Sequence, residues 1–265
     1  MRNVIKDIFF NLRMGFGIKL FGLKKSFGYY SRMRDALAGL KKNGYCRLEE
    51  YYTSKEVDDF HNECLSILDR SDEIFQKDNA IKDSLERSDG EIKIKHLQRI
   101  SNKLKIYSNE FFFTLISFFF NGHPRLATVF FHLVHDGTFI HKSVPGKSER
   151  RIGGHWHFDS FDHLLKCFVL LDDITPETGG ETAMILNSRK KIRHIKNAKE
   201  KFKDYISNQK YDYNEKELKE LNIMTDTNVK NFYGKKGDVF FVDTSHLHRG
   251  SPLKKGIKRC LWLYF

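Results

Sequence analysis

Apolar positions divide the chain into a helical first half and a strand-rich second half. A helix is predicted for residues 33–42, because Asn43-Gly44 forms a stop that is typical of a helix C-terminus. Thr53-Ser54-Lys55-Glu56 matches a capping box, and apolar residues then recur at helical spacing, which predicts a second helix over about 54–70. Helical spacing returns between about 94 and 120.

Beyond residue 126 the pattern becomes that of β-strands. Residues 127–134 are rich in β-branched and aromatic side chains, which predicts a strand. Short apolar runs bounded by turn residues follow at 138–141, 166–171, 182–186, 239–242 and 260–265. This pattern is typical of an antiparallel sandwich or barrel.

These elements predict one main domain with a separate N-terminal segment. We expect a fold that is mainly β with N-terminal helices, in which residues 33–125 form a mostly helical support and residues 126–265 form the β core. The Lys-rich stretch 187–236 has a largely helical pattern and is predicted to be an insertion between two strands. Residues 1–32 form a basic amphipathic segment ahead of the domain.

The composition excludes several classes of protein. The 24 Phe and 11 Tyr among 265 residues exclude an intrinsically disordered chain, which lacks the aromatic side chains to build a core. The four cysteines form no C-x-x-C pair, so neither a disulfide framework nor a zinc knuckle is indicated and a reducing compartment is expected. The longest apolar run, residues 111–120, is about half of the ~20 residues that span a bilayer.

Positive charge is concentrated at the N-terminus. The net charge is +12, and residues 1–47, with eleven basic and two acidic side chains, carry +9 of it. Apolar residues within 1–25 recur at helical spacing, which leaves two interpretations: peripheral contact with an anionic membrane through residues 1–47, or a terminal helix packed on the domain. The apolar run near the start is too short for a signal peptide, so we expect a cytoplasmic protein, peripheral on the inner face of a membrane under the first interpretation. The absence of a nucleic-acid reader motif makes nucleic acid an unlikely partner.

The candidate chemistry lies in two clusters of histidine and aspartate. In an extended segment, residues two apart share a face, so His157 and Asp159 can present a nitrogen and an oxygen to one point. His248, shortly after a predicted strand, can supply a third ligand, and His155 and His246 are the fallback ligands if the register differs. Two histidines and one carboxylate form the facial triad that suits non-haem Fe(II).

A facial triad leaves three coordination positions open, so a 2-oxo acid can fill two of them and O₂ the third. A co-substrate with a second carboxylate also needs a cation. Arg259 can grip a carboxylate with two hydrogen bonds and is the predicted partner; the nearby alternatives are Lys254, Lys255 and Lys258.

Lys166 and Phe168 share a face of the strand that follows the H-x-D motif. We assign both to the co-substrate pocket as candidates. Phe168 has the alternative of being an ordinary core residue, whereas a lysine within Leu-Leu-Lys-Cys-Phe is not expected to be buried without a partner.

Several stretches together resemble the phytanoyl-CoA dioxygenase family of Fe(II)/2-oxoglutarate oxygenases. They occur in the same order and include His155-Trp-His-Phe-Asp159, Leu171-Asp-Asp-Ile-Thr-Pro-Glu-Thr-Gly-Gly180 and Asp243-Thr-Ser-His-Leu-His-Arg-Gly250. The resemblance covers about 125–265 and implies a double-stranded β-helix, the cupin-like jelly roll. It also implies iron held by His157, Asp159 and His248, with 2-oxoglutarate held by Arg259.

The resemblance further implies a reaction. With O₂, such enzymes decarboxylate 2-oxoglutarate to succinate and hydroxylate a substrate. The halogenases of the family replace the carboxylate ligand by a small residue, so Asp159 favours hydroxylation. The substrate class stays open between a small molecule, a lipid and a saccharide. The basic stretch 187–236 favours an anionic substrate, unless it is simply a solvated helix face.

Two other functions compete with an oxygenase. The zinc hydrolase motif H-x-H-x-D-H begins in the same way, but Ser160 stands where that motif needs histidine. The other is a non-catalytic jelly-roll module that docks on an anionic membrane through residues 1–47.

Overall fold

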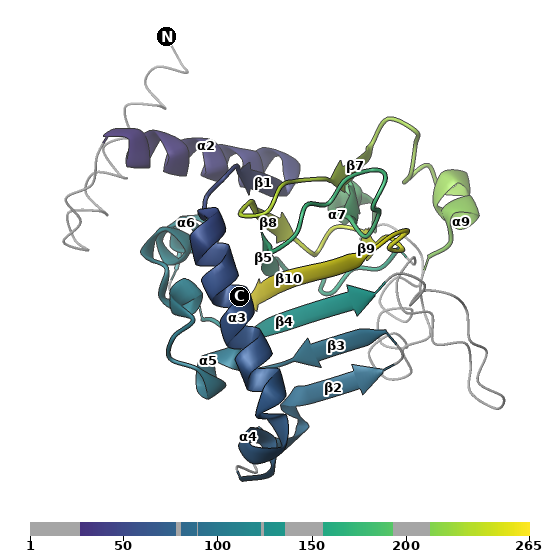
Figure 1. Cartoon of the computed structure of the whole chain (residues 1–265). Coiled ribbons are helices and arrows are strands. Elements are labelled where there is room, and N and C mark those ends of the chain that lie inside the picture. Colours follow the sequence, from purple (N-terminus) through teal and green to yellow (C-terminus); the bar gives the residue numbers. More distant parts are fainter. Residues whose placement is uncertain (1–26, 78–80, 89, 123–124, 136–155, 193–212) are drawn as a thin grey trace, which may run out of the picture.

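Two antiparallel β-sheets face each other, and helices cover the outer face of the larger sheet (Figure 1). The computed structural model describes residues 27–77, 81–88, 90–122, 125–135, 156–192 and 213–265. The strands described are β1 (Tyr45–Leu48), β2 (Leu85–Ser88), β3 (Glu91–Ile94), β4 (Thr128–His135), β5 (Leu165–Leu170), β6 (Thr182–Ile185), β7 (Val229–Phe232), β8 (Val239–Asp243), β9 (His248–Gly250) and β10 (Ile257–Tyr264). The seven-stranded sheet has the order β1-β8-β5-β10-β4-β3-β2, and the three-stranded sheet has the order β7-β6-β9.

Most of the helices precede the central strands in the chain. Those described are α2 (Phe27–Asn43), α3 (Ser54–Asp69), α4 (Ser71–Lys77), α5 (Leu97–Ile100), α6 (Glu110–Phe120), α7 (Ser188–Ile192) and α9 (Glu215–Glu220), with the 3₁₀ helices η1 (Lys82–Ser84) and η2 (Lys105–Ser108). The predicted capping box begins α3, because Glu56 N–H donates to Thr53 Oγ1 at 3.3 Å and Thr53 N–H donates to Glu56 Oε2 at 2.8 Å.

Helix α2 ends at Asn43 as predicted, and Gly44 follows it with a φ of 79°. The buried side chains of α2 include Met33, Leu37 and Leu40, which join the core between the helices and the larger sheet. For this part of the basic segment, packing on the domain is therefore the interpretation that the structure supports. Residues 1–26, with the predicted amphipathic helix, lie outside the described residues.

Strand alternation divides the larger sheet into two faces. On β5, Leu165, Cys167 and Val169 pack against the helices, whereas Phe168 and Leu170 face the smaller sheet. Strand β10 behaves in the same way, with Leu261 and Leu263 on the helix side. The inner faces of the two sheets enclose a cluster formed by Phe168, Leu170, Ile174, Met184, Phe232, Phe240, Val242 and Cys260.

The structure differs from the predicted domain layout in two places. The stretch 33–125 also contains β1, β2 and β3, which extend the larger sheet at both of its edges. Residues 187–236 are not all insertion, because β7 pairs with β6 inside the smaller sheet. These strands are four residues long, so the sequence pattern is too short to reveal them, and it is their partners elsewhere in the chain that stabilise them.

Some predicted elements lie outside the described residues, namely the strand 138–141 and most of the Lys-rich run after residue 192. Of the helices that the structure describes, none is long and apolar enough to cross a membrane.

Candidate metal centre

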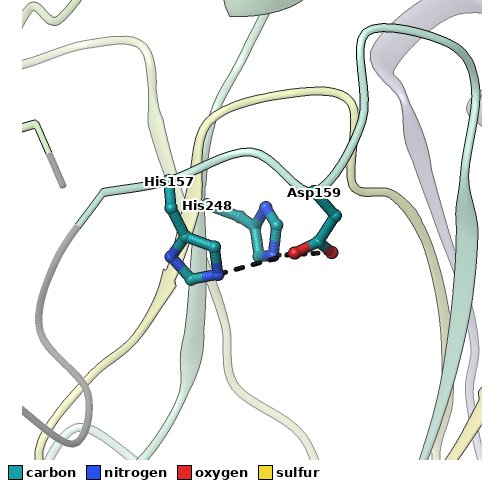
Figure 2. Close-up of side chains that lie close together, drawn as sticks. All are labelled: His157, Asp159 and His248. Atoms are coloured by element: carbon teal, nitrogen blue, oxygen red, sulfur yellow. Dashed lines mark ion pairs between the residues drawn. The ribbon is translucent and has the colours of Figure 1, made fainter. Parts of the chain in front are cut away.

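His157 and His248 are brought together by pairing between two distant segments. The N–H of His157 donates to the His248 carbonyl at 3.0 Å, and the N–H of His248 donates to the His157 carbonyl at 2.8 Å. The two imidazole rings lie side by side with their centroids 4.4 Å apart. Figure 2 shows both rings and the Asp159 carboxylate turned toward one another.

Alternation along residues 156–159 explains why two candidate ligands point inward. Trp156 and Phe158 are buried in a separate apolar cluster on the outer side of the smaller sheet, against Tyr213 and Leu218. His157 and Asp159 therefore take the opposite face. The backbone of Asp159 is fixed as well, since its N–H donates to the Thr244 carbonyl at 2.9 Å.

The three side chains offer ligand atoms that all lie within 4.8 Å of one another. Nε2 of His157 is 3.8 Å from Oδ1 of Asp159, and Nε2 of His248 is 3.4 Å from Oδ2. Within the described part of the chain, this is the one group of His, Cys, Asp and Glu with metal-binding geometry. The structure thus assembles the three residues that the sequence singled out.

The tautomer of His248 shows that this geometry fits a cation. Its Nδ1 lies 3.0 Å from the His246 carbonyl, which can only accept, so Nδ1 carries the proton. In the neutral ring, which is the form that binds a metal, Nε2 presents a lone pair toward Asp159, and this buried atom has no hydrogen-bond partner among the described residues. A lone pair and a carboxylate repel each other unless a cation lies between them, and N₂O donor sets of this kind suit Fe(II).

Lys166 makes a direct contact with the proposed carboxylate ligand. Its Nζ lies 2.6 Å from Oδ2 of Asp159, and both side chains are largely buried. Burial would raise the pKa of Asp159, but Lys166 and the two imidazoles outweigh it and hold this pKa well below its usual value. Burial would likewise lower the pKa of Lys166, yet Asp159 and Tyr264 raise it. The pair is therefore ionised at neutral pH.

Aromatic side chains complete the surroundings of Lys166. Its Nζ lies 4.6 Å from the ring centroid of Tyr264 and 5.8 Å from that of Trp262, both on β10. Trp262, Tyr264 and Thr244 are not among the site residues that the sequence predicted. The signal for the aromatic pair was the alternation along β10, which places Trp262 and Tyr264 on one face and Leu261 and Leu263 on the other.

Two of the remaining predicted residues lie on different faces of the larger sheet. Phe168 faces inward and lines a narrow cavity between the sheets, with its ring 5.4 Å from that of Trp262. Arg259 does not join the metal group. Its guanidinium binds both oxygens of Asp172 and approaches His61 of α3, because Arg259 shares the helix-facing side of β10 with Leu261 and Leu263.

The structure also separates His246 from the metal group. The His246 ring packs against Gly44, and its Nδ1 lies 3.2 Å from the Asp243 carbonyl. Burial lowers the pKa of His246. The other fallback ligand, His155, lies outside the described residues.

Comparison with known proteins identifies the family. The model of the family "Phytanoyl-CoA dioxygenase (PhyH)" matches residues 40–259. The chain belongs to the phytanoyl-CoA dioxygenase family. Members of this family are Fe(II)/2-oxoglutarate-dependent oxygenases, so iron and 2-oxoglutarate are the cofactors. None of the curated proteins matches the sequence.

Solved structures show the same fold at low sequence identity. The non-haem α-ketoglutarate-dependent epimerase SnoN from nogalamycin biosynthesis aligns with a TM-score of 0.60 at 13% identity, covering 88% of this chain and 80% of SnoN. EctD from S. alaskensis with bound Fe aligns with a TM-score of 0.60 at 18% identity, covering 86% and 74%. HygX from Streptomyces hygroscopicus, with nickel, 2-oxoglutarate and hygromycin B bound, aligns with a TM-score of 0.54 at 14% identity, covering 87% and 86%. The predicted double-stranded β-helix is confirmed.

Proposed function

We propose that this member of the phytanoyl-CoA dioxygenase family hydroxylates a substrate that is a small molecule, a lipid or a saccharide. In this proposal, His157, Asp159 and His248 hold the iron. The observation that carries the proposal is the convergence of their three ligand atoms within 4.8 Å of one another. When bound, Fe(II) supplies the site at which O₂ reacts with 2-oxoglutarate. One oxygen atom enters the substrate as a hydroxyl group and the other enters succinate, while CO₂ leaves.

The residues of the chain prepare this site in three ways. The backbone bridge between His157 and His248 fixes the separation of the two imidazoles. The His246 carbonyl sets the tautomer of His248, and the Thr244 carbonyl holds the backbone of Asp159. Lys166 occupies one side of the Asp159 carboxylate at Oδ2, which leaves Oδ1 turned toward His157. Together they hold the three donor atoms within 4.8 Å of one another.

Succinate formation tests the oxygenase reaction without knowledge of the substrate. Purified protein with Fe(II), ascorbate and 2-oxoglutarate should form succinate slowly in the absence of substrate. Asp159→Ala should abolish this turnover and weaken Ni²⁺ binding measured by calorimetry. Asp226→Ala is the matched control, because its side chain is 93% exposed and lies outside the proposed metal site. Metal binding without any 2-oxoglutarate turnover would contradict the proposal.

A metabolite screen with ¹⁸O₂ identifies the substrate and shows whether the reaction is a hydroxylation. Hydroxylation predicts a product that gains one labelled oxygen atom, whereas an epimerisation of the kind named for SnoN adds none. We expect an anionic substrate to rank high, because the stretch 187–236 is rich in lysine.

We also propose a cytoplasmic protein that contacts anionic membrane through its N-terminal segment. The proposal rests on the excess of basic residues in 1–47, of which residues 27–43 belong to the packed helix α2. Co-sedimentation with phosphatidylserine vesicles at low salt tests it, and protein that stays in the supernatant would contradict it.

A further inference from the structure

The inner face of β10 and β4 carries aromatic side chains that are only half-buried. On the outer face of β10, Leu261 and Leu263 are completely buried against the helices. On the inner face, Phe130, Trp262 and Tyr264 keep part of their surface exposed. The ring centroid of Tyr264 lies 4.9 Å from that of Phe130 and 6.4 Å from that of Trp262. Neighbouring aromatic rings that stay partly exposed are typical of a surface that binds a ligand.

This aromatic surface lies next to the candidate metal centre. Nζ of Lys166 is 4.6 Å from the ring centroid of Tyr264 and 5.8 Å from that of Trp262. The same Nζ is 2.6 Å from Oδ2 of Asp159. One lysine side chain therefore separates the rings from a proposed metal ligand, so a molecule that packs on the rings lies beside the metal group.

His96 has a strained backbone at the edge of the same surface. Its φ is 56°, in the left-handed region that residues other than glycine rarely adopt. Its Nδ1 lies 3.2 Å from Oγ1 of Thr128, which is directly opposite Tyr264 in the sheet. Backbone strain of this kind is concentrated at sites that bind ligands, because the surrounding structure must hold it in place.

His132 gives the surface a buried nitrogen without a partner. The residue is 7% exposed, lies opposite Cys260 on the inner face, and has its ring centroid 4.9 Å from that of Trp262. Its Nε2 lies 2.5 Å from Oε1 of Glu91, an ionised carboxylate that can only accept, so Nε2 carries the proton. Burial lowers the pKa of His132, so the ring is neutral and Nδ1 is an acceptor. Nδ1 has no hydrogen-bond partner in the described ranges, and it suits a ligand group that donates, such as a hydroxyl.

Beyond His132 the inner face of the larger sheet becomes polar. Lys93 lies opposite His132 on β3, and Glu86 lies opposite Lys93 on β2, with side chains 31% and 49% exposed. The apolar cluster between the two sheets takes none of its described residues from β4, β3 or β2. A long acyl chain on this surface would meet charged groups. A molecule with apolar ring faces and hydroxyl groups at its edges matches both parts of the surface.

We propose that this face of β10, β4 and β3 binds the substrate and that the substrate is a saccharide. The inference rests on the proposed function, because it assumes that the reaction takes place at the metal group. The C–H groups of the sugar pack on Trp262 and Tyr264, and one hydroxyl donates to Nδ1 of His132. The narrow cavity on the β5 side of β10 stays free for the co-substrate.

Saturation-transfer NMR with defined probes tests the inference. Protein loaded with Zn²⁺ and 2-oxoglutarate is mixed with methyl glycosides and hexuronic acids in one set, and with octanoate and dodecanoate in another. At least one sugar should bind, with transfer strongest at its ring C–H protons. Among deoxy forms of that sugar, one should bind about 5- to 100-fold more weakly, because it leaves the buried acceptor without a donor.

Three variants connect binding to this surface. His132→Phe should weaken binding of the sugar by a similar factor and should no longer distinguish it from the deoxy form. His132→Asn retains an acceptor near the position of Nδ1, so it should keep most of the affinity even if His132→Phe folds poorly. His135→Phe is the matched control on the same strand and should bind as the unsubstituted protein does, because His135 is exposed and lies on the outer face.

The outcomes separate this inference from the proposed function. Failure of every sugar to bind, or a sugar whose affinity is unchanged in His132→Phe, would overturn the inference. If succinate still forms from 2-oxoglutarate in that case, the proposed function stands without it. If the unsubstituted protein forms no succinate, the proposed function fails, and a bound sugar is then not a substrate.

Discussion

Replacing Lys166 by methionine tests whether the charge of this residue stabilises the metal site. Methionine is similar in length and apolar, so the variant removes the ammonium with little change in volume. In the unsubstituted protein, Nζ of Lys166 lies 2.6 Å from Oδ2 of Asp159, and their side chains are 8% and 15% exposed. The variant therefore leaves the Asp159 carboxylate buried without this partner.

The expected loss follows from this geometry. At 2.6 Å the Coulomb attraction of the pair is roughly 6 kcal/mol at an effective dielectric constant of about 20. Part of this offsets the cost of burying both groups. Removing one partner of a buried pair typically costs about 3–5 kcal/mol, which is a large fraction of the ~5–15 kcal/mol stability of a domain.

Urea unfolding followed by circular dichroism in metal-free buffer measures the loss. Lys55→Met is the matched control, because Lys55 and Asp59 form an ion pair of 2.7 Å on the surface, with side chains 84% and 61% exposed. Water screens that pair, so its removal should change the free energy of unfolding little. The slope of the transition should be the same for all variants.

A double-mutant cycle separates charge from packing. Asp159→Asn in the Lys166→Met background removes the unpaired charge, so the double variant should recover most of the lost stability. If Lys166→Met unfolds at the same urea concentration as Lys55→Met, the ion pair does not stabilise the site. The same conclusion follows if the double variant is no more stable than Lys166→Met.

Two further predictions concern groups outside the metal site. Burial would raise the pKa of Glu91, but its contacts with His132 and Lys93 lower it to about 2 from an ordinary value of 4.5. The ionised Glu91 carboxylate should therefore contribute about 3 kcal/mol to the free energy of unfolding above about pH 5, and this contribution should be lost as the pH falls toward 2. When the free energy of unfolding is measured against pH, Glu91→Gln should lose less of it over this range than the unsubstituted protein does. Gly44→Ala should cost about 1–3 kcal/mol in thermal unfolding, because Gly44 has a φ of 79° and an added Cβ would lie 2.7 Å from Cε1 of His246. A midpoint unchanged by Gly44→Ala would contradict the close packing of His246.

Local sequence patterns predicted much of the fold and the three candidate metal ligands. The capping box of α3 and the stop after α2 depend on a few neighbouring residues, so the sequence alone located these helix ends. The spacing of His157 and Asp159 works for a similar reason, because alternation in an extended segment puts both on one face. Alternation along β10 likewise divides its side chains between two faces. The sequence does not show which of these faces points inward, because that depends on the strands that pair with β10.

Tertiary structure decided the rest. Only the pairing of β10 with β4 and β5 shows that Lys258 faces the cavity and that Arg259 faces α3. On that side, the Arg259 guanidinium binds Asp172 and lies close to His61. The short strands β1 and β7 likewise exist through partners far away in the chain. The contact between Lys166 and Asp159 joins two separate segments of the chain. Local spacing does not predict that these two side chains lie within ion-pair distance. Residue type and local spacing, which the amino-acid sequence encodes directly, identify the side chains that can act. The fold decided which of them meet, because long-range pairing sets the direction of every strand face.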